Sequence, residues 1–145
     1  MPESALYEQD YYAWANEQAA LLRAGKLAAA DIENIAEEIE SLGKSEKREL
    51  VSRFIVLLKH LLQWQFQPKR RSTSWEVAVT VQRNALARHF EDNPSRVPVA
   101  NKAITAAYLD ARLEASAETK LSRKSFPATC PWTLAQIADE NLWPA

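Results

Sequence analysis

Glycine and cysteine are both scarce in this 145-residue sequence, which contains two glycines and one cysteine. Few glycines, together with abundant Ala, Leu and Glu, favour helices over a turn-rich β fold. A single cysteine excludes a disulfide within the chain and is typical of a reducing compartment. We therefore interpret Cys130 as a packing or surface thiol and expect a helical, cytoplasmic protein.

Motifs of the common enzyme classes are also missing. The sequence has no Gly-rich phosphate loop, no Gly-x-Ser-x-Gly, no Cys-x-x-Cys and no His-Glu-x-x-His. The acidic N-terminus lacks the apolar segment of a secretory signal. Arg53, Lys59 and His60 interrupt the most apolar run, which is then too short to span a membrane. We expect no cofactor, no metal site and no membrane association, and these absences favour a protein that is not an enzyme.

The most apolar stretch extends from Glu49 to Gln67 and contains neither Gly nor Pro. Its polar residues gather in a sector of roughly 120°, so about two thirds of the circumference is apolar. Such a wide apolar face must be covered by more than one neighbouring helix. We predict a central helix over about residues 45–67, which Pro68 ends. Its large apolar residues recur at helical spacing, namely Leu50, Phe54, Leu57, Leu58, Leu61 and Leu62.

Two further helices are predicted before the central one. Asp10 has the side chain to cap a first helix, which Gly25 stops. Asp31 caps a second helix, which Gly43 ends or interrupts. Ile32, Ile35, Ala36, Ile39 and Leu42 form the apolar stripe of this second helix.

The second half of the chain predicts three more helices. Thr73 and Glu76 have the spacing of a capping box that begins a helix over about residues 74–90. Another helix is expected over about residues 97–118, and Thr133 caps a short last one. The sequence thus predicts an all-α fold, a single-domain helical bundle over residues 1–145. It has five main helices plus a short C-terminal helix, with a less regular tail from about residue 120.

Charge is spread unevenly, although the net charge is only −1. Residues 1–50 contain 11 acidic and 5 basic side chains, whereas residues 51–125 contain 6 acidic and 13 basic ones. We expect these regions to pair within one bundle; separate acidic and basic faces are the alternative. A nearly neutral chain is atypical of a dedicated nucleic-acid binder.

Catalytic candidates are His60, Glu37, Glu38 and Glu40. Histidine can act as a general base near neutral pH, and a carboxylate from the preceding helix would complete such a site. A carboxylate-bridged metal site needs Glu-x-x-His pairs, which neither histidine provides. The simpler interpretation is a solvated acidic face, or ion pairs with basic helices, and a histidine with structural hydrogen bonds.

Basic and aromatic residues gather where the helix after Pro68 begins. An anion or an acidic partner is favoured at a helix N-terminus by free amides and the helix dipole. The alternative is that Arg71 pairs with a glutamate while Trp75 packs in the core. The candidates for this anion- or partner-binding site are Lys69, Arg70, Arg71, Trp75 and Arg83.

Several segments occur in the same order in a bacterial protein family. The distinctive ones are EEIESLG, HLLQWQFQP and RSTSW, within DIENIAEEIESLGKSEKREL and LLKHLLQWQFQPKRRSTSW. Over nearly its whole length the chain resembles this family, which is catalogued as domain of unknown function twenty-nine. The resemblance implies an almost entirely α-helical cytoplasmic protein, and it carries no activity, cofactor or catalytic residue to transfer.

Three functional hypotheses follow from these features. The leading one is a non-catalytic bacterial interaction or regulatory module that binds a protein partner, with the corner of residues 71–75 as a binding site. One alternative is a hydrolase or metal-assisted enzyme that combines His60 with the carboxylates of the preceding helix. The other is a nucleic-acid-associated accessory protein that uses the basic region 69–88, with Lys69, Arg70, Arg71, Arg83 and Arg88.

Overall fold

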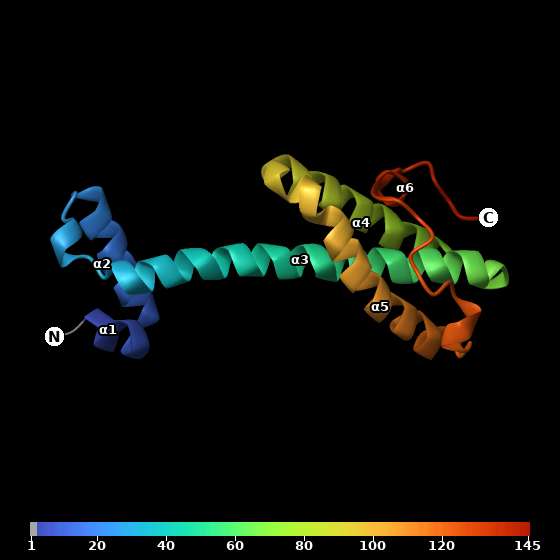
Figure 1. Ribbon diagram of the computed structural model, residues 1–145, viewed down its shortest axis with the longest axis horizontal. Helices are drawn as coiled ribbons and strands as arrows, with labels where there is room; N and C mark the ends of the chain where they lie inside the picture. Colours follow the sequence, from blue (N-terminus) through green and yellow to red (C-terminus); the bar gives the residue numbers. More distant parts are fainter. Residues whose placement is uncertain (1–2) are drawn as a thin grey trace. The chain divides into compact units, whose positions relative to one another are not determined.

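The computed structural model describes residues 3–145, and the regular elements within this range are all helical (Figure 1). The all-α class predicted from the sequence is confirmed. Short 3₁₀ turns join the helices, among them η2 (Pro68–Arg70), η3 (Pro94–Val99) and η4 (Arg123–Ser125). The helices are α1 (Glu3–Gln9), α2 (Tyr11–Arg23), α3 (Ile32–Phe66), α4 (Thr73–Asp92), α5 (Ala100–Thr119) and α6 (Leu134–Ala138).

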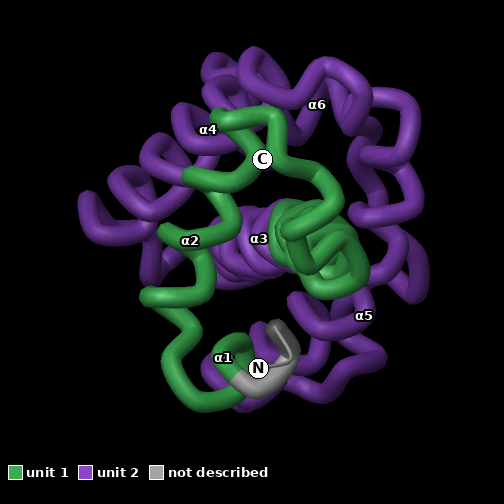
Figure 2. Tube along the Cα trace, turned by 90° about the vertical axis from the view of Figure 1, so that its left-hand side faces the viewer, with its two compact units in different colours: residues 1–46 green, residues 47–145 purple. Residues whose placement is uncertain are grey.

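Contacts along the chain divide it into two compact units (Figure 2). Unit 1 comprises residues 1–46, and unit 2 comprises residues 47–145. The first part of α3 belongs to unit 1 and the remainder to unit 2. The single-domain organisation over residues 1–145 stays a prediction.

Helix α3 is one continuous helix of 35 residues, which corrects the sequence prediction at this point. The sequence predicted two helices here, one that Gly43 ends or interrupts and a central one over about residues 45–67. A glycine inside a helix costs only about 1 kcal/mol relative to alanine. Gly43 does not have the positive φ of a helix-ending glycine. The good helix formers on both sides of it therefore carry the helix through.

In unit 1, hydrogen bonds to Asp31 join the start of α3 to α2. The buried Trp14 donates its indole N–H to the Asp31 carboxylate at 3.0 Å, and the buried Gln18 accepts from the Asp31 amide at 2.7 Å. The predicted Asp10 cap is confirmed, since its side chain accepts from the Ala13 amide at 3.0 Å. Gly25, at a φ of 73°, follows the end of α2 as predicted.

In unit 2, the remainder of α3 is the centre of the hydrophobic core. Figure 2 shows α4, α5 and α6 arranged around it. Helix α5 places small residues against α3, and Ala107, Ala111 and Ala115 are fully buried. The predicted role of this stretch as the central helix is confirmed. Its fully buried residues are Phe54, Leu57, Leu58, Leu61 and Leu62, with Leu50 at 1 % exposure.

Caps in unit 2 agree with the predictions except at the start of α4. Helix α3 ends at Phe66, two residues before Pro68, and a capping box at Thr133 begins α6. The N-cap of α4, however, is Ser72 rather than Thr73, because the Ser72 hydroxyl accepts from the Trp75 amide at 3.3 Å. Serine caps helices at least as well as threonine, so the helix begins one residue earlier.

Truncation of the leucines at the centre of unit 2 will destabilise it. We expect Leu58→Ala and Leu61→Ala each to lower the free energy of unfolding by about 2–5 kcal/mol, since both leave cavities in a packed core. The matched control is Leu113→Ala, whose side chain is 52 % exposed and which should cost below about 0.5 kcal/mol. Urea unfolding followed by circular dichroism measures all three, and losses equal to the control would refute the central role of α3.

The two glycines will respond oppositely to alanine. A Cβ at Gly43 meets no atom within 4 Å, so Gly43→Ala should stabilise α3 by roughly 0.5–1 kcal/mol. Gly25→Ala should destabilise by about 1 kcal/mol, because its left-handed backbone strains any Cβ. Thermal unfolding of both variants tests this pair, and equal shifts of the same sign would contradict it.

Candidate functional site

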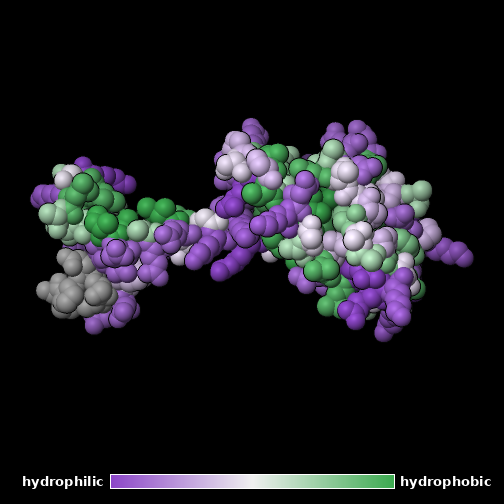
Figure 3. Space-filling model, in the orientation of Figure 1, coloured by the Kyte–Doolittle hydropathy of each residue, from purple (hydrophilic) through white to green (hydrophobic). Residues whose placement is uncertain are grey.

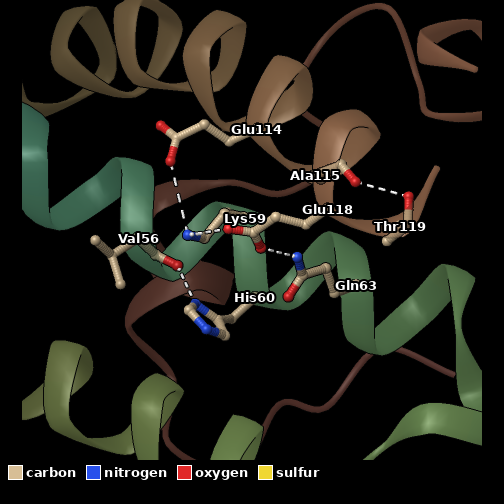
Figure 4. Close-up of polar contacts among 8 residues, drawn as sticks. All are labelled: Val56, Lys59, His60, Gln63, Glu114, Ala115, Glu118 and Thr119. Carbon is tan, nitrogen blue, oxygen red and sulfur yellow. Dashed lines mark hydrogen bonds and ion pairs between the residues drawn. The ribbon is translucent and has the colours of Figure 1, made fainter. Parts of the chain in front are cut away.

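A polar seam lies between α3 and α5 in unit 2 (Figure 4). The Lys59 ammonium contacts Glu118 at 3.1 Å and Glu114 at 3.6 Å, and only 14 % of the Lys59 side chain is exposed. Gln63 donates its side-chain amide to the other carboxylate oxygen of Glu118. We call these four residues the polar seam.

Helical spacing explains how the polar seam forms. Lys59 and Gln63 are four residues apart on α3, and Glu114 and Glu118 are four apart on α5, so each pair occupies one face of its helix. The buried alanines of α5 allow its backbone to approach α3 closely. Lys59 and Gln63, two members of the polar sector predicted on the central helix, therefore meet carboxylates of α5.

The ionised state of Glu118 is favoured by its neighbours. Burial acts to raise the pKa of this carboxyl, but hydrogen bonds from Gln63 and Lys59 and the charge of Lys59 outweigh it. The pKa of Glu118 therefore lies below its usual range. The Lys59 ammonium lies between the two carboxylates, so the seam is a charge-paired cluster.

His60 lies next to the seam and is held by its own helix. Its Nδ1 is 2.7 Å from the Val56 carbonyl oxygen, which requires Nδ1 to carry a proton (Figure 4). The charge of His60 contributes to the lowered pKa of Glu118. Sequence reasoning had not singled out Glu118. The only sequence feature that could have indicated Glu118 is its one-turn spacing from Glu114 on a predicted helix.

The carboxylates proposed as partners of His60 belong to unit 1, whereas His60 belongs to unit 2. The assignment of Glu37, Glu38 and Glu40 with His60 to one catalytic site stays a prediction. Within unit 1, Glu38 accepts hydrogen bonds from the hydroxyls of Tyr7 and Tyr11. These bonds lower the pKa of Glu38, and the bond to Glu38 raises the pKa of Tyr7 to about 12.

A pocket of about 220 Å³ opens beside the seam and brings together two residues of the predicted basic corner. Arg70 and Trp75 both line it. Glu118 lines it too, and its negative charge counteracts the attraction of Arg70 for an anion. The remaining lining residues are Gln63, Gln67 and Thr119.

Arg71 and Arg83 hold the C-terminal segment. Arg71 donates to the carbonyls of Trp64 at 2.7 Å and Pro144 at 3.2 Å. Arg83 is 4 % exposed, donates to the Ile137 carbonyl at 2.8 Å and lies over the Trp143 ring. Burial lowers the pKa of Arg83, opposed by the charge of Asp139.

Exposed basic residues of the predicted corner are therefore few. Lys69 and Arg70 are exposed on η2, and Arg88 is exposed on α4. Arg71 and Arg83 donate to backbone carbonyls of the protein, Arg83 through Nε alone. The assignment of these residues to an anion- or partner-binding site stays a prediction.

A family profile described as "Domain of unknown function DUF29" matches residues 6–143. The chain belongs to this family. The comparison with curated proteins found no match, and neither did the comparison with solved structures. The resemblance inferred from the sequence is confirmed, and membership in DUF29 assigns no activity.

Cys130 of this DUF29 chain lines a separate cleft. The cleft has a volume of about 500 Å³ and is also lined by Tyr108, Thr105 and Trp132. Burial raises the pKa of the Cys130 thiol, and the thiol contacts the Trp132 carbonyl at 3.4 Å. A thiol with a raised pKa is a weak nucleophile. The structure thus supports the interpretation of Cys130 as a packing residue.

No helix within residues 3–145 of this DUF29 chain combines the length and apolar character needed to cross a bilayer.

The Glu118 contacts will make the stability of unit 2 depend on pH. A carboxylate whose pKa is lowered by folding contributes stability above its unfolded-state pKa and loses it as pH falls through the folded-state pKa. We expect wild type to exceed Glu118→Gln in unfolding free energy near neutral pH, and the difference to shrink between about pH 6 and pH 3.

Urea unfolding at several pH values measures this difference. Glu140→Gln, which removes an exposed carboxylate outside the seam, controls for the loss of one charge. A Glu118→Gln difference that stayed constant down to the lowest pH would contradict a role of the ionised Glu118 in the seam.

Proposed function

We propose that this DUF29 chain is a non-catalytic bacterial module that binds a protein partner through the first part of α3. The supporting observation is a row of apolar side chains on that helix that solvent reaches. Ile32, Ile39 and Leu42 are 52 %, 63 % and 67 % exposed, and Ile35 between them is half-buried. We call these four residues the apolar stripe.

The apolar stripe follows the periodicity of helix-in-groove recognition. Its members occupy positions i, i+3, i+7 and i+10 of α3, which place them on one face over about 15 Å of helix. Figure 3 shows hydrophobic residues gathered along one edge of this part of the chain, with hydrophilic residues on the opposite edge. An amphipathic face of this kind, open to solvent, is typical of a docking surface.

Unit 1 has further apolar residues that are exposed to solvent. Leu22 at the end of α2 is 42 % exposed, and Leu27 in η1 (Leu27–Ala29) is 59 % exposed. Single exposed leucines are common in proteins, but a set concentrated in a unit of 46 residues is not. The concentration supports binding of an apolar surface by unit 1.

The two alternative functions have less support. A nucleic-acid accessory role relied on five basic residues of region 69–88, of which Arg71 and Arg83 are engaged by backbone carbonyls. The hydrolase hypothesis combines His60 with three carboxylates, of which Glu38 accepts hydrogen bonds from Tyr7 and Tyr11. Neither alternative has a feature of the strength of the apolar stripe.

Affinity capture tests the proposed function. The full chain is immobilised and exposed to extract of its native cells, and retained proteins are identified by mass spectrometry. We expect the wild type to retain a discrete protein and the variant Ile39→Glu/Leu42→Glu to lose it. Two charges buried in the interface should weaken binding of that protein by about tenfold or more.

The matched control for this capture is Leu109→Glu/Leu113→Glu. It adds the same charges at apolar residues of α5 that are 64 % and 52 % exposed. Circular dichroism verifies that both variants remain helical. Retention of the same proteins by wild type and by the stripe variant would refute the proposal.

A further inference from the structure

We infer that the partner of the apolar stripe is a second copy of this chain, whose groove between α3, η3 and α5 receives it. This inference rests on the proposed function and names its partner. The receiving surface is in unit 2 and the stripe is in unit 1, so each copy carries both halves of the contact.

The receiving groove has an apolar floor. It has a volume of about 310 Å³ and is formed by Leu50 and Val51 of α3, Val99 of η3, and alanines of α5. Leu50 is 1 % exposed, whereas Val99 is 43 % exposed, so the floor passes from the core out to solvent. An apolar helix face would cover Val99 and extend the core outward.

The rim of the groove is positively charged. Lys47, Arg96 and Lys102 come from three different elements and converge on it, and its lining, which lies wholly in the described chain, contains no carboxylate. Lys47 and Lys102 form no ion pair with the described side chains, those of residues 6–145. We call this surface the basic groove. Its chemistry suits an apolar helix flanked by carboxylates.

The apolar stripe has those flanking carboxylates. Glu33, Glu37 and Glu40 recur at one-turn spacing along one side of the stripe and are exposed. None of the three forms an ion pair with a side chain that the structure describes. The stripe and the groove therefore match in two respects. The apolar side chains of the stripe would cover the apolar floor of the groove, and the carboxylates beside the stripe would pair with the ammonium groups of Lys47 and Lys102.

Total charge favours the same pairing between copies. Residues 1–46 carry ten acidic and three basic side chains, whereas residues 47–145 carry nine acidic and fifteen basic ones. The acidic unit of one chain is thus attracted to the basic unit of another.

Each copy carries one stripe and one groove. A pair of copies related by a twofold axis would therefore form the contact twice, as in an isologous dimer.

Analytical ultracentrifugation of the full chain tests the inference with exchanged charges. The flank variant is Glu37→Lys/Glu40→Lys, and the groove variant is Lys47→Glu/Lys102→Glu. We expect wild type to dimerise, and each variant alone to dimerise at least about tenfold more weakly, because like charges then face each other in both contacts. An equimolar mixture of the two variants should restore the dimer, since each contact then pairs opposite charges.

The control variant is Glu17→Lys/Lys124→Glu, which reverses exposed charges away from both surfaces and should dimerise like wild type. A wild-type chain that sediments as a monomer over about a hundredfold range of concentration would overturn the inference. A dimer that the mixture fails to restore would overturn it as well.

The capture experiment keeps the inference separate from the proposed function. A monomeric wild type whose stripe still retains a different protein would leave the proposed function standing and remove only the self-association. A stripe variant that both dimerises and captures like wild type would remove both.

Discussion

Burial of the leucine-rich face of α3 is the constraint on which unit 2 depends. Leu57, Leu58, Leu61 and Leu62 are fully buried, and α4, α5 and the C-terminal segment are arranged around them. Burial of each such side chain contributes about 1.5–3 kcal/mol, so this face outweighs any single polar contact in the unit. The polar seam exists because α5 must approach this face closely, which brings Glu114 and Glu118 onto the remaining polar sector.

The same helix has a different chemistry in its first part. There the apolar residues form a narrow stripe, and the side chains of Ile39 and Leu42 remain more than half exposed. The apolar side chains of the stripe are unfavourably exposed to water. The carboxylates beside them carry negative charge that no ion pair among the described side chains balances. A partner with an apolar, positively charged surface relieves both, and the basic groove of unit 2 offers such a surface to another copy.

Two arginines of the predicted anion- or partner-binding site also form hydrogen bonds that link segments of unit 2. Arg71 and Arg83 donate to the carbonyls of Trp64, Pro144 and Ile137, and so hold the irregular C-terminal segment against α3 and α4. Arg71 uses two of its guanidinium nitrogens for these bonds, whereas Arg83 uses Nε alone, and its two terminal nitrogens are buried without a hydrogen-bond partner.

The sequence by itself determined the all-α class, the buried face of the central helix, the caps at Asp10 and Thr133, and the family, because periodicity and capping are local properties. It did not determine that α3 continues through Gly43, since the cost of one glycine is small compared with the helix formers around it. Which residues meet across helices was decided only by the tertiary structure. Lys59 pairs with Glu118, and Arg83 meets Ile137, because packing of the apolar faces brings distant segments together, and no local pattern encodes that pairing.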